Sequence, residues 1–557
     1  MTAQTFLRGS ASRWWMPPRQ PAAPANVLLI ACAWIASVGN LALWKQLQSL
    51  GALAGGSGWL LAAGLAGFIV GILTLVTGAF AWRWTFKPAL VLLLLISAGS
   101  AHFSLSFGTI MDPSMMINML QTDTKEAADL LTPTLVGNLL LLAGLPVAWL
   151  IAQPVSIGTA RQAWRRNVKL VVAGLLGTLL SILISFQPLA STMRNHKQVR
   201  YLINPLNVMY SLGSALFSGP AQSRQVQPIG EDAAIVKRFD GQRPPLLVLV
   251  VGETARSGNF GMNGYARQTT PQLAAQDVVS FTNAWSCGTS TAASVPCMFS
   301  RMTRTEFVDR DHDEEGLLDV LQRAGYGVLW VDNQAGCKGV CDRVPSAKVQ
   351  PADAPSLCSG EECLDEALLA GLDERLQALP AERRAHGVFI VLHQMGSHGP
   401  AYSRRSPSTS KPFEPECTSS QLQDCSGAEL VNAYDNSIAY TDRMLAGTIK
   451  WLKQKELSWS SAMIYVSDHG ESLGEHNLYL HGLPYALAPD FQKHVPWVNW
   501  MSMPFRQGAG VDWKCLASKK DAEVLHDHLF HSVLGLMNVS TKVYTPSLDF
   551  FAQCRRS

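Results

Sequence analysis

Five long apolar stretches, all within the first 190 residues, constrain the fold of this chain most strongly. Each is free of Lys, Arg, Asp and Glu and about 17–24 residues long, the length of a helix that crosses ~30 Å of hydrocarbon. The stretches are Val27–Trp44, Trp59–Trp82, Ala89–Phe107, Leu135–Ala152 and Leu170–Phe186. Buried helices of a large soluble protein are the alternative, which five stretches in succession disfavour. We therefore predict a five-helix transmembrane domain over residues 1–190.

The basic residues between the stretches predict the orientation of these helices. They gather in alternate loops, at Arg8, Arg13, Arg19, Arg83, Lys87, Arg161, Arg165, Arg166 and Lys169, whereas the other loops hold only Lys45 and Lys125. Loops rich in Lys and Arg stay in the cytoplasm. We therefore expect a cytoplasmic N-terminus, and we expect everything after Phe186 to lie outside. The first stretch lacks a small-residue cleavage site and is expected to remain as an anchor.

The cysteines agree with an oxidising location for the second half of the chain. Cys32 lies in the first apolar stretch, and the other ten cysteines all follow Ser286. They fall into near neighbours, namely Cys287/Cys297, Cys337/Cys341, Cys358/Cys363 and Cys417/Cys425, leaving Cys515/Cys554. An even set in an exported domain favours disulfides. The spacing does not fix the connectivity, and Cys337 with Cys341 also matches a metal site.

Residues 244–557 alternate short apolar runs with helical patterns. The runs cover residues 246–251, 278–285, 327–332, 387–392 and 462–467. Continuous apolar strands separated by helices are typical of a parallel sheet covered on both faces. We predict a multi-domain protein in which residues 244–557 form an α/β/α domain with a mostly parallel sheet. Residues 191–243 are expected to form a bridging interfacial helix and a linker. The formal net charge of +3, without a long basic run, argues against a nucleic-acid partner.

Acidic and imidazole side chains and one lysine follow these runs, at the strand ends where such sheets bind ligands. They are Glu253, Lys338, His393, His398, Asp468, His469, Glu471, Glu475, His476 and His481. A lone Glu there is more often a helix cap, and a lone His is more often an ordinary hydrogen-bonded residue. The pair Asp468–His469 directly at a strand end is instead a compact ligand pair. Mixed carboxylate and imidazole ligands suit catalytic Zn²⁺, whereas oxygen ligands alone suit Mg²⁺ or Ca²⁺.

A hydroxyl-rich stretch, "SCGTSTAASVPCMFS" at residues 286–300, follows another run and is expected at the same edge of the sheet. Metal coordination lowers the pKa of an alcohol and makes it a competent nucleophile. The N-terminus of the following helix would favour a phosphate. The pattern does not decide which hydroxyl reacts among Thr289, Ser290, Thr291 and Ser294.

The loop between the third and fourth stretches contains "MMINMLQTDTKEAADLL" at residues 115–131. Its apolar residues recur at helical spacing, and Asn118, Thr122 and Glu126 recur every four positions, on one face. One interpretation is an amphipathic helix lying on the bilayer. The other is a polar face that helps to hold a lipid headgroup, and the pattern leaves both open.

Several long motifs together identify a resemblance over essentially the whole chain. They are "VVGETARSGNFGMNGY", "SCGTSTAASVPCMFS", "GCKGVCDRVP", "GSHGP" and "DHGESLG…YLHG". They closely resemble the bacterial phosphoethanolamine transferases that modify lipid A, a family that includes the transferable colistin-resistance enzymes. That family belongs to the alkaline phosphatase/sulfatase superfamily, and its members are zinc enzymes.

The resemblance implies roles for particular residues. Thr291 would be the nucleophile, and one tightly bound zinc would be held by Glu253, Thr291, Asp468 and His469. Lys338, His398, Glu471 and His481 match positions that, in the family, bind the phosphoethanolamine group or a second zinc. Of these residues, Lys338, His398 and His481 would also assist catalysis. Asn118, Thr122 and Glu126 would help to hold the donor lipid, and Asn333 would bind substrate. The chain departs from the family pattern at Gln334, Ala335 and His476.

The resemblance implies a two-step reaction. Thr291 would take phosphoethanolamine from phosphatidylethanolamine and pass it to a lipid A phosphate, which lowers surface negative charge and gives polymyxin resistance. Transfer to another acceptor, such as a core sugar or a periplasmic glucan, is the nearest alternative. Phosphoglycerol transferases share the architecture, but the dense disulfide set disfavours them. A non-catalytic membrane sensor module is disfavoured by the complete set of ligands. We expect a monomer spanning the bacterial inner membrane, with its catalytic domain in the periplasm.

Overall fold

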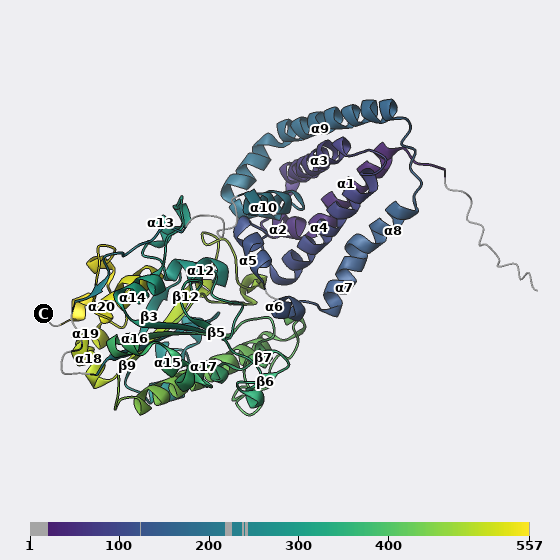
Figure 1. The fold of residues 1–557 in the computed structure, drawn as a ribbon. Helices are drawn as coiled ribbons and strands as arrows, with labels where there is room; N and C mark the ends of the chain where they lie inside the picture. Colours follow the sequence, from purple (N-terminus) through teal and green to yellow (C-terminus); the bar gives the residue numbers. More distant parts are fainter. Residues whose placement is uncertain (1–19, 123, 218–225, 237–238, 240–242, 556–557) are drawn as a thin grey trace, which may run out of the picture. The chain divides into compact units, whose positions relative to one another are not determined.

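A computed structural model describes residues 20–122, 124–217, 226–236, 239 and 243–555, without the side chains of residues 124–126, 197 and 217 (Figure 1). The described residues form two compact units. One unit comprises the chain up to His102 and from Gly137 to Leu206, and the other comprises Phe103–Val136 and the chain from Asn207 onward. The expected boundary after residue 190 therefore falls inside a helix, and the loop after the third span groups with the C-terminal unit.

The first unit is helical. Among the described residues, five helical segments are long and apolar enough to span a membrane, as the sequence predicts. Pro24–Ser37 (α1) and Leu41–Ser49 (α2) make the first, Gly55–Ala79 (α3) the second, Phe86–Phe107 (α4) the third, Pro133–Leu139 (α7) with Leu145–Ala152 (α8) the fourth, and Ala160–Asn195 (α9) the fifth. Arg8, Arg13 and Arg19, which precede the first stretch, lie outside the described residues.

Small residues allow α3 and α9 to pack closely. A Cβ added at Gly64 would lie 2.1 Å from Ser185 Oγ, and one at Gly174 would lie 2.5 Å from the backbone nitrogen of Leu75. Membrane helices associate through such small-residue contacts because lipid tails offer no hydrophobic driving force. The interface between the second and fifth spans thus depends on side chains too small to separate the backbones.

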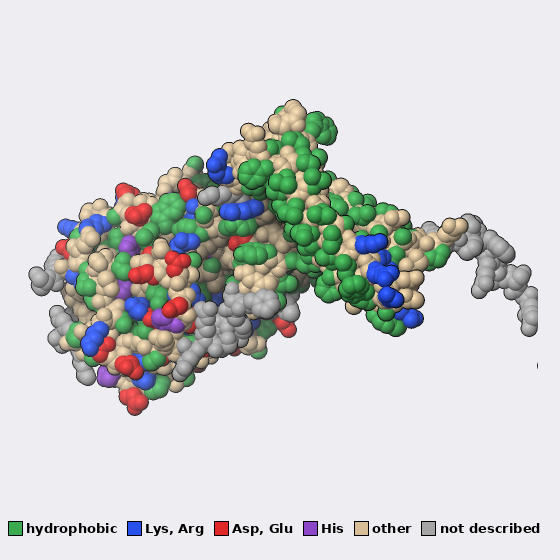
Figure 2. Space-filling view, turned by 90° about the horizontal axis from the view of Figure 1, so that it is seen from above, with side chains coloured by type: hydrophobic (Ala, Val, Ile, Leu, Met, Phe, Trp, Pro, Cys, Tyr) green, Lys and Arg blue, Asp and Glu red, His purple; other side chains and the backbone are tan. Residues whose placement is uncertain are grey.

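The outer surface of the helical unit is apolar. Leu176, Leu183 and Phe186 on α9 are exposed, and so is Ile151 on α8. Figure 2 shows hydrophobic side chains over most of the visible surface of this unit, with Lys and Arg side chains gathered at one end. Such a surface is stable in lipid rather than in water, so the five helices form a membrane domain.

An eight-stranded sheet forms the centre of the second unit, counted over the described residues, with the strand order β13-β3-β12-β9-β2-β8-β4-β5. The strands are Pro245–Gly252 (β2), Val278–Trp285 (β3), Gly327–Asp332 (β4), Ser346–Lys348 (β5), Val388–His393 (β8), Ser460–Ser467 (β9), His494–Met501 (β12) and Val524–Leu525 (β13). All neighbours pair in parallel except β12, which is antiparallel to both β3 and β9. The mostly parallel α/β/α fold predicted from the apolar runs is confirmed.

The antiparallel strand β12 was missed by the sequence analysis. Its sequence, HVPWVNWM, contains Pro496, which cannot donate a hydrogen bond to a neighbouring strand and argues against a central strand. The structure accommodates Pro496 through a shift in the β12–β3 register between Val495 and Trp497. Because β12 reverses the direction twice, β3 still runs parallel to β9 and ends at the same edge.

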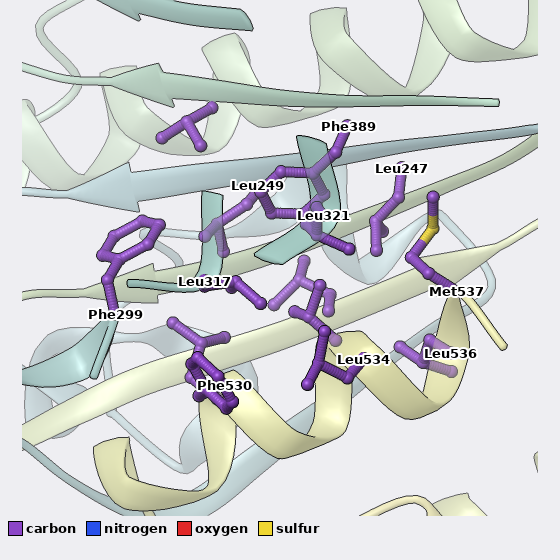
Figure 3. Close-up of a cluster of buried hydrophobic side chains, with 14 of the residues drawn as sticks. Leu247, Leu249, Phe299, Leu317, Leu321, Phe389, Phe530, Leu534, Leu536 and Met537 are labelled. Carbon is purple, nitrogen blue, oxygen red and sulfur yellow. The ribbon is translucent and has the colours of Figure 1, made fainter. Parts of the chain in front are cut away.

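Helices cover both faces of the sheet, and alternate residues of each strand serve the two faces. On β2, Leu247 and Leu249 belong to one hydrophobic cluster and Leu246 and Val248 to the other. The first cluster includes side chains of Leu317–Ala324 (α14) and Leu529–Leu536 (α20), as Figure 3 shows. The second includes side chains of Leu372–Ala378 (α15) and Gly427–Gln454 (α17). Full burial on both faces explains why these strands are continuously apolar.

Shorter elements complete this unit. Its other helices are Thr291–Met298 (α12), Arg304–Asp309 (α13), Pro271–Ala274 (α11), Ala381–His386 (α16), Met503–Gly508 (α18), Trp513–Ser518 (α19) and Leu206–Phe217 (α10). Two-stranded pairs form between Ala234–Ile235 (β1) and Val539–Ser540 (β14), Cys358–Ser359 (β6) and Glu362–Cys363 (β7), and Ser472–Leu473 (β10) and Tyr479–Leu480 (β11).

The loop segment expected as one amphipathic helix is instead two helices, Pro113–Gln121 (α5) and Thr124–Asp129 (α6). The chain is extended at Thr122, whose hydroxyl donates to Asn118 O at 2.8 Å. Threonine commonly makes such local bonds, which compete with helix continuation. The expectation of a single polar face was therefore wrong for Thr122, although its side chain remains next to Asn118.

Five disulfides occur among the described residues, and each joins the neighbouring cysteines that the sequence grouped. The pairs are Cys287–Cys297, Cys337–Cys341, Cys358–Cys363, Cys417–Cys425 and Cys515–Cys554. Cys32 is free and buried in the membrane domain. All five bridges therefore lie in the second unit, as expected for an oxidising compartment.

Candidate active site

Two adjacent parallel strands bring acidic side chains to one edge of the sheet. β2 pairs with β9 up to Gly252 opposite Ser467, so Glu253 and Asp468 leave the sheet side by side. His469 follows directly. All three side chains are buried. The parallel register of β2 and β9 therefore brings the two strand ends together, as the sequence predicts.

These three residues, the metal group hereafter, point their ligand atoms at one another. Nε2 of His469 lies 3.2 Å from Glu253 Oε1 and 3.4 Å from Asp468 Oδ2. Among the described residues, neither of these two buried oxygens has a hydrogen-bond donor. Buried carboxylate oxygens left in this way are costly unless a cation or a proton compensates them. The donor set of two carboxylates and one imidazole fits a divalent metal ion.

Thr291 is the hydroxyl that faces the metal group. Its Oγ donates to Glu253 Oε2 at 3.0 Å and lies 3.5 Å from His469 Nε2. By contrast, Thr289 Oγ donates to Leu483 O at 2.6 Å, and Ser294 Oγ donates to Asp468 O. Two of the other candidate hydroxyls, those of Thr289 and Ser294, thus donate to backbone carbonyls instead.

The position of Thr291 in the fold suits an attack on phosphate. It is the first residue of α12, with the buried Ser290 in extended backbone before it. The Cys287–Cys297 disulfide joins the loop before α12 to its last turn. The amide groups at the start of a helix favour negative charge. A phosphoryl group at Thr291 would therefore meet both these amides and the metal group.

Charges within the metal group shift one another's pKa values. Burial, with the charge of Glu253, raises the pKa of Asp468 to about 7. Burial alone would lower the pKa of His469, but Asp468 and Glu253 raise it to about 10. Burial opposes ionisation of Glu253, yet the positive charge of the adjacent His469 holds its pKa below the ordinary value. Protons therefore stabilise this cluster, and a bound cation would displace them.

A second group lies next to the metal group and comprises Glu471, His481 and the shared His469. Here the acceptor oxygens have partners, because Tyr402 donates to Glu471 Oε1 at 2.5 Å and Nδ1 of His481 lies 2.8 Å from Oε2. The rings of His481 and His398 are 5.4 Å apart. Burial raises the pKa of Glu471 to about 8, and a positive charge bound beside it would favour the carboxylate form. The exposed His476 is not part of this group.

Two residues with predicted substrate roles lie in the loop after β4. Lys338 adopts a positive φ of 52°, and its Nζ donates to Ala335 O at 3.2 Å and to Gln121 O at 3.3 Å. The contact with Gln121 brings Lys338 to the end of α5. The amide nitrogen of Asn333 instead donates to Asp365 Oδ1 and to Cys363 O, both below 3 Å. Asn333 is thus engaged in organising the loop itself.

The predicted donor-lipid residues are only partly described. Asn118 and Thr122 are half-buried at the end of α5. The side chain of Glu126 lies outside the described residues. The alternative metal site at Cys337 and Cys341 is not supported, because these two cysteines form a disulfide and offer no thiolate.

Sequence reasoning missed the roles of two residues at the site. Gln334, noted only as a departure from the family pattern, donates to Glu253 Oε2 at 2.9 Å. His526 connects the two sides of the site, because Nδ1 accepts from Cys287 N at 3.2 Å and Nε2 lies 3.0 Å from Ser467 O. Burial lowers the pKa of His526 to about 3, which keeps it neutral in this bridge. A lone histidine 239 residues from Cys287 and 59 residues from Ser467 gives no local signal.

Two family profiles match the chain. One, described as sulfatase, covers residues 245–539, and the other, described as phosphoethanolamine transferase EptA/EptB, covers residues 69–218. Together they extend over both units. The sulfatase match alone covers more than half of the chain.

Similar proteins match over nearly the full length. Phosphoethanolamine transferase EptA of Escherichia coli strain K12 is 38% identical over 95% of this chain and 96% of its own length. Phosphatidylethanolamine transferase Mcr-1 of Escherichia coli is 36% identical over 94% and 96%. A solved structure, the integral membrane lipooligosaccharide phosphoethanolamine transferase A (EptA) from Neisseria meningitidis, matches with a TM-score of 0.90 and 35% identity over 97% of this chain and 100% of that chain.

Proposed function

The chain belongs to the phosphoethanolamine transferase family of sulfatase fold, and we propose that it transfers phosphoethanolamine from phosphatidylethanolamine to a phosphate of lipid A through an ester on Thr291. The observation that carries the proposal is the Thr291 hydroxyl aimed at a buried carboxylate–histidine cluster. Thr291 Oγ lies 3.0 Å from Glu253 Oε2 and 3.5 Å from His469 Nε2.

Zn²⁺ is the metal ion that this cluster suits. Glu253, Asp468, His469 and Thr291 would hold it, through two carboxylates, one imidazole and the hydroxyl oxygen. When bound, zinc lowers the pKa of a coordinated hydroxyl and stabilises negative charge on a phosphoryl oxygen. Gln334 and Gly470 orient the ligands, because Gln334 donates to Glu253 and the Gly470 carbonyl faces Nδ1 of His469 at 2.9 Å. Such outer contacts fix the ring orientation of a ligating histidine.

The first step forms the covalent intermediate. Thr291 Oγ attacks the phosphorus of phosphatidylethanolamine, and the bond from phosphorus to the diacylglycerol oxygen breaks. The hydroxyl proton leaves along the contact from Thr291 to Glu253. The departing oxygen takes a proton from His481 or His398, which are close together beside Glu471. Diacylglycerol then leaves, and Thr291 carries the phosphoethanolamine group.

The second step regenerates the enzyme. A phosphate oxygen of lipid A attacks the phosphorus of the Thr291 ester, and a new phosphorus–oxygen bond forms as the bond from phosphorus to Thr291 Oγ breaks. The Thr291 oxygen recovers its proton along the contact with Glu253, and the proton of the attacking phosphate replaces the one that the histidine gave up. The net reaction converts phosphatidylethanolamine and lipid A into diacylglycerol and phosphoethanolamine-modified lipid A. The chemistry of both steps is phosphoryl transfer at one site, so the substrates bind in turn.

Charge complementarity supports the second group as the headgroup site. Glu471 is buried beside His481, and a carboxylate here would attract the ammonium of ethanolamine, while Lys338 would face the phosphate. Asn118, Thr122 and Glu126 would hold the donor lipid at the membrane surface. These residues follow α4 in the sequence and belong to the second unit, which begins at Phe103.

The membrane domain explains how the enzyme meets two lipid substrates. Loop charges predict that the catalytic unit lies outside the inner membrane, in the periplasm, where its disulfides are stable. The modification adds an ammonium to an anionic phosphate. A less negative surface attracts cationic peptides such as polymyxin less strongly, so resistance is the expected consequence.

Mass spectrometry of lipid A tests the proposal directly. Cells that lack their own transferases would express the wild-type chain or the Thr291→Ala variant. The proposal predicts lipid A with one added phosphoethanolamine unit for the wild type and none for the variant. Modified core sugar or modified periplasmic glucan with unmodified lipid A would overturn the choice of acceptor. Products that carry phosphoglycerol instead of phosphoethanolamine would overturn the choice of donor.

A further inference from the structure

A buried ion pair joins the segment after the third span to the loop that carries His398. Asp129 is the last residue of α6, and Arg405 lies on Tyr402–Arg405 (η9), a short helical turn after β8. Arg405 Nη2 lies 3.0 Å from Asp129 Oδ2. The two side chains are 5% and 4% exposed, so water screens the pair little. Both residues belong to the same compact unit.

Arg405 contacts a substrate-side residue at the same time. Its Nε donates to the backbone oxygen of His398 at 2.8 Å, while Nη2 reaches Asp129. The planar guanidinium fixes the directions of both bonds relative to each other. The position of the His398 backbone is therefore tied to the position of α6 through one rigid group.

The same helical turn contacts the second group from its other end. Tyr402, three residues before Arg405, donates to Glu471 Oε1 at 2.5 Å and is buried. A displacement of η9 would therefore disturb both His398 and Glu471. Gln421 adds a contact to the chain just after α6, because its amide nitrogen donates to Thr132 Oγ.

We propose that Asp129 and Arg405 are positioning residues that hold α5 and α6 against the second group. In this position, a phosphoethanolamine headgroup bound near α5 and α6 would lie next to His398 and Glu471. This proposal rests on the proposed function, which assigns donor binding to Asn118, Thr122 and Glu126. Asp129 follows these residues within the same segment. The pair acts through other residues and touches no reacting atom.

The neighbouring Arg404 provides a matched control. Its Nη1 also contacts Asp129, at 2.7 Å, but its side chain is 59% exposed. Its guanidinium makes no contact with His398 among the described residues, whereas that of Arg405 does. Exposed ion pairs contribute little because water screens them. Equal losses from Arg404 and Arg405 variants would indicate general charge attraction rather than positioning.

The test compares a lipid donor with a small donor on purified full-length protein in detergent. The lipid donor is phosphatidylethanolamine, and the small donor is p-nitrophenyl phosphoethanolamine, which has no acyl chains. Asp129→Asn should raise the KM for phosphatidylethanolamine about tenfold and leave hydrolysis of the small ester within about twofold of wild type. Arg405→Gln should raise the same KM and also slow the small ester, because the His398 backbone loses its donor. Arg404→Gln should change the lipid KM less than about threefold.

Zinc content and thermal unfolding of each variant separate positioning from misfolding. If Arg405→Gln fails to fold, Asp129→Asn decides alone, because this substitution keeps the shape of the side chain and removes only its charge. A parallel loss on both donors for Asp129→Asn, or no change on either, would overturn the proposal. A wild-type protein that transfers from neither donor would instead overturn the proposed function.

Discussion

The metal group and the second group share His469 and the same edge of the sheet, yet their carboxylates are satisfied differently. Glu253 Oε1 and Asp468 Oδ2 face His469 without a hydrogen-bond donor among the described residues. Both oxygens of Glu471 instead have partners, in Tyr402 and His481. The first arrangement needs a cation or protons to compensate its charge, whereas both carboxylate oxygens of the second already have hydrogen-bond partners. We infer that the metal group holds a cation and that the second group binds the substrate headgroup.

The largest expected effect is the loss of a metal ligand. Asp468→Asn removes one of two buried carboxylates, so bound zinc should fall below stoichiometric amounts and transfer from phosphatidylethanolamine should fall by roughly 10³–10⁴-fold. Metal analysis of the purified variant and a lipid transfer assay measure both. Asp490→Asn, at a mostly exposed carboxylate outside the site, serves as the control. Full zinc content in Asp468→Asn would contradict the assignment of the metal group.

An intermediate effect is expected from the second group. Glu471→Gln keeps the hydrogen bond to one neighbour but removes the charge, so transfer should fall by about 10–100-fold while zinc content stays that of wild type. The combination of lost activity and retained metal separates the two groups. If Glu471→Gln loses zinc as Asp468→Asn does, the groups form one two-metal centre and the comparison fails.

The pH dependence of zinc binding should follow the metal group. In the metal-free protein, the pKa of Asp468 is raised to about 7, so a proton occupies its carboxylate below that pH. Zinc needs the carboxylate form and must displace this proton. His469, whose pKa is raised to about 10, must also lose a proton. The apparent Kd for zinc should therefore rise about tenfold for each pH unit from 10 down to 7 and about a hundredfold for each unit below 7, measured by competition with a chelator of known affinity. The Glu471→Gln variant should keep the same slope, and a flattened slope there would contradict a separate second group.

The smallest effect should come from Gln334, which contacts the metal group without being a ligand. Gln334→Ala removes a neutral donor to Glu253 Oε2, so transfer should fall only about 3–10-fold. Steady-state kinetics at saturating zinc measure the change. A loss as large as that of Asp468→Asn would mean that Gln334 belongs to the reacting centre itself.

Much of the fold could be predicted because physical constraints act on local sequence. Bilayer thickness sets the length of an apolar helix, and two-sided burial makes parallel strands continuously apolar. The strand β12 escaped prediction because Pro496 interrupts its pattern, and only the register shift in three dimensions resolves the conflict. The break at Thr122 escaped for a similar reason, since a side-chain bond to Asn118 O outweighs helical spacing.

In the candidate site, too, some residues could be predicted from the sequence and others could not. Residues directly after strands, such as Glu253 and Asp468, could be placed because the sheet brings its strand ends together. The choice of Thr291 among four hydroxyls followed from resemblance alone, and the structure adds that Thr289 and Ser294 donate to backbone carbonyls. His526 could not be found, because its bridge between Cys287 and Ser467 depends on contacts between distant parts of the chain.

The central claim is that Thr291 carries the transferred group during turnover. The most direct measurement is the intact mass of zinc-loaded protein after incubation with phosphatidylethanolamine, followed by fragmentation of the peptide that contains residues 286–300. The account predicts one added phosphoethanolamine unit on Thr291 in the wild type, the same unit on the serine of Thr291→Ser, and no added mass in Thr291→Ala. A phosphoethanolamine adduct on Thr291→Ala, or on another residue of the wild type, would contradict it.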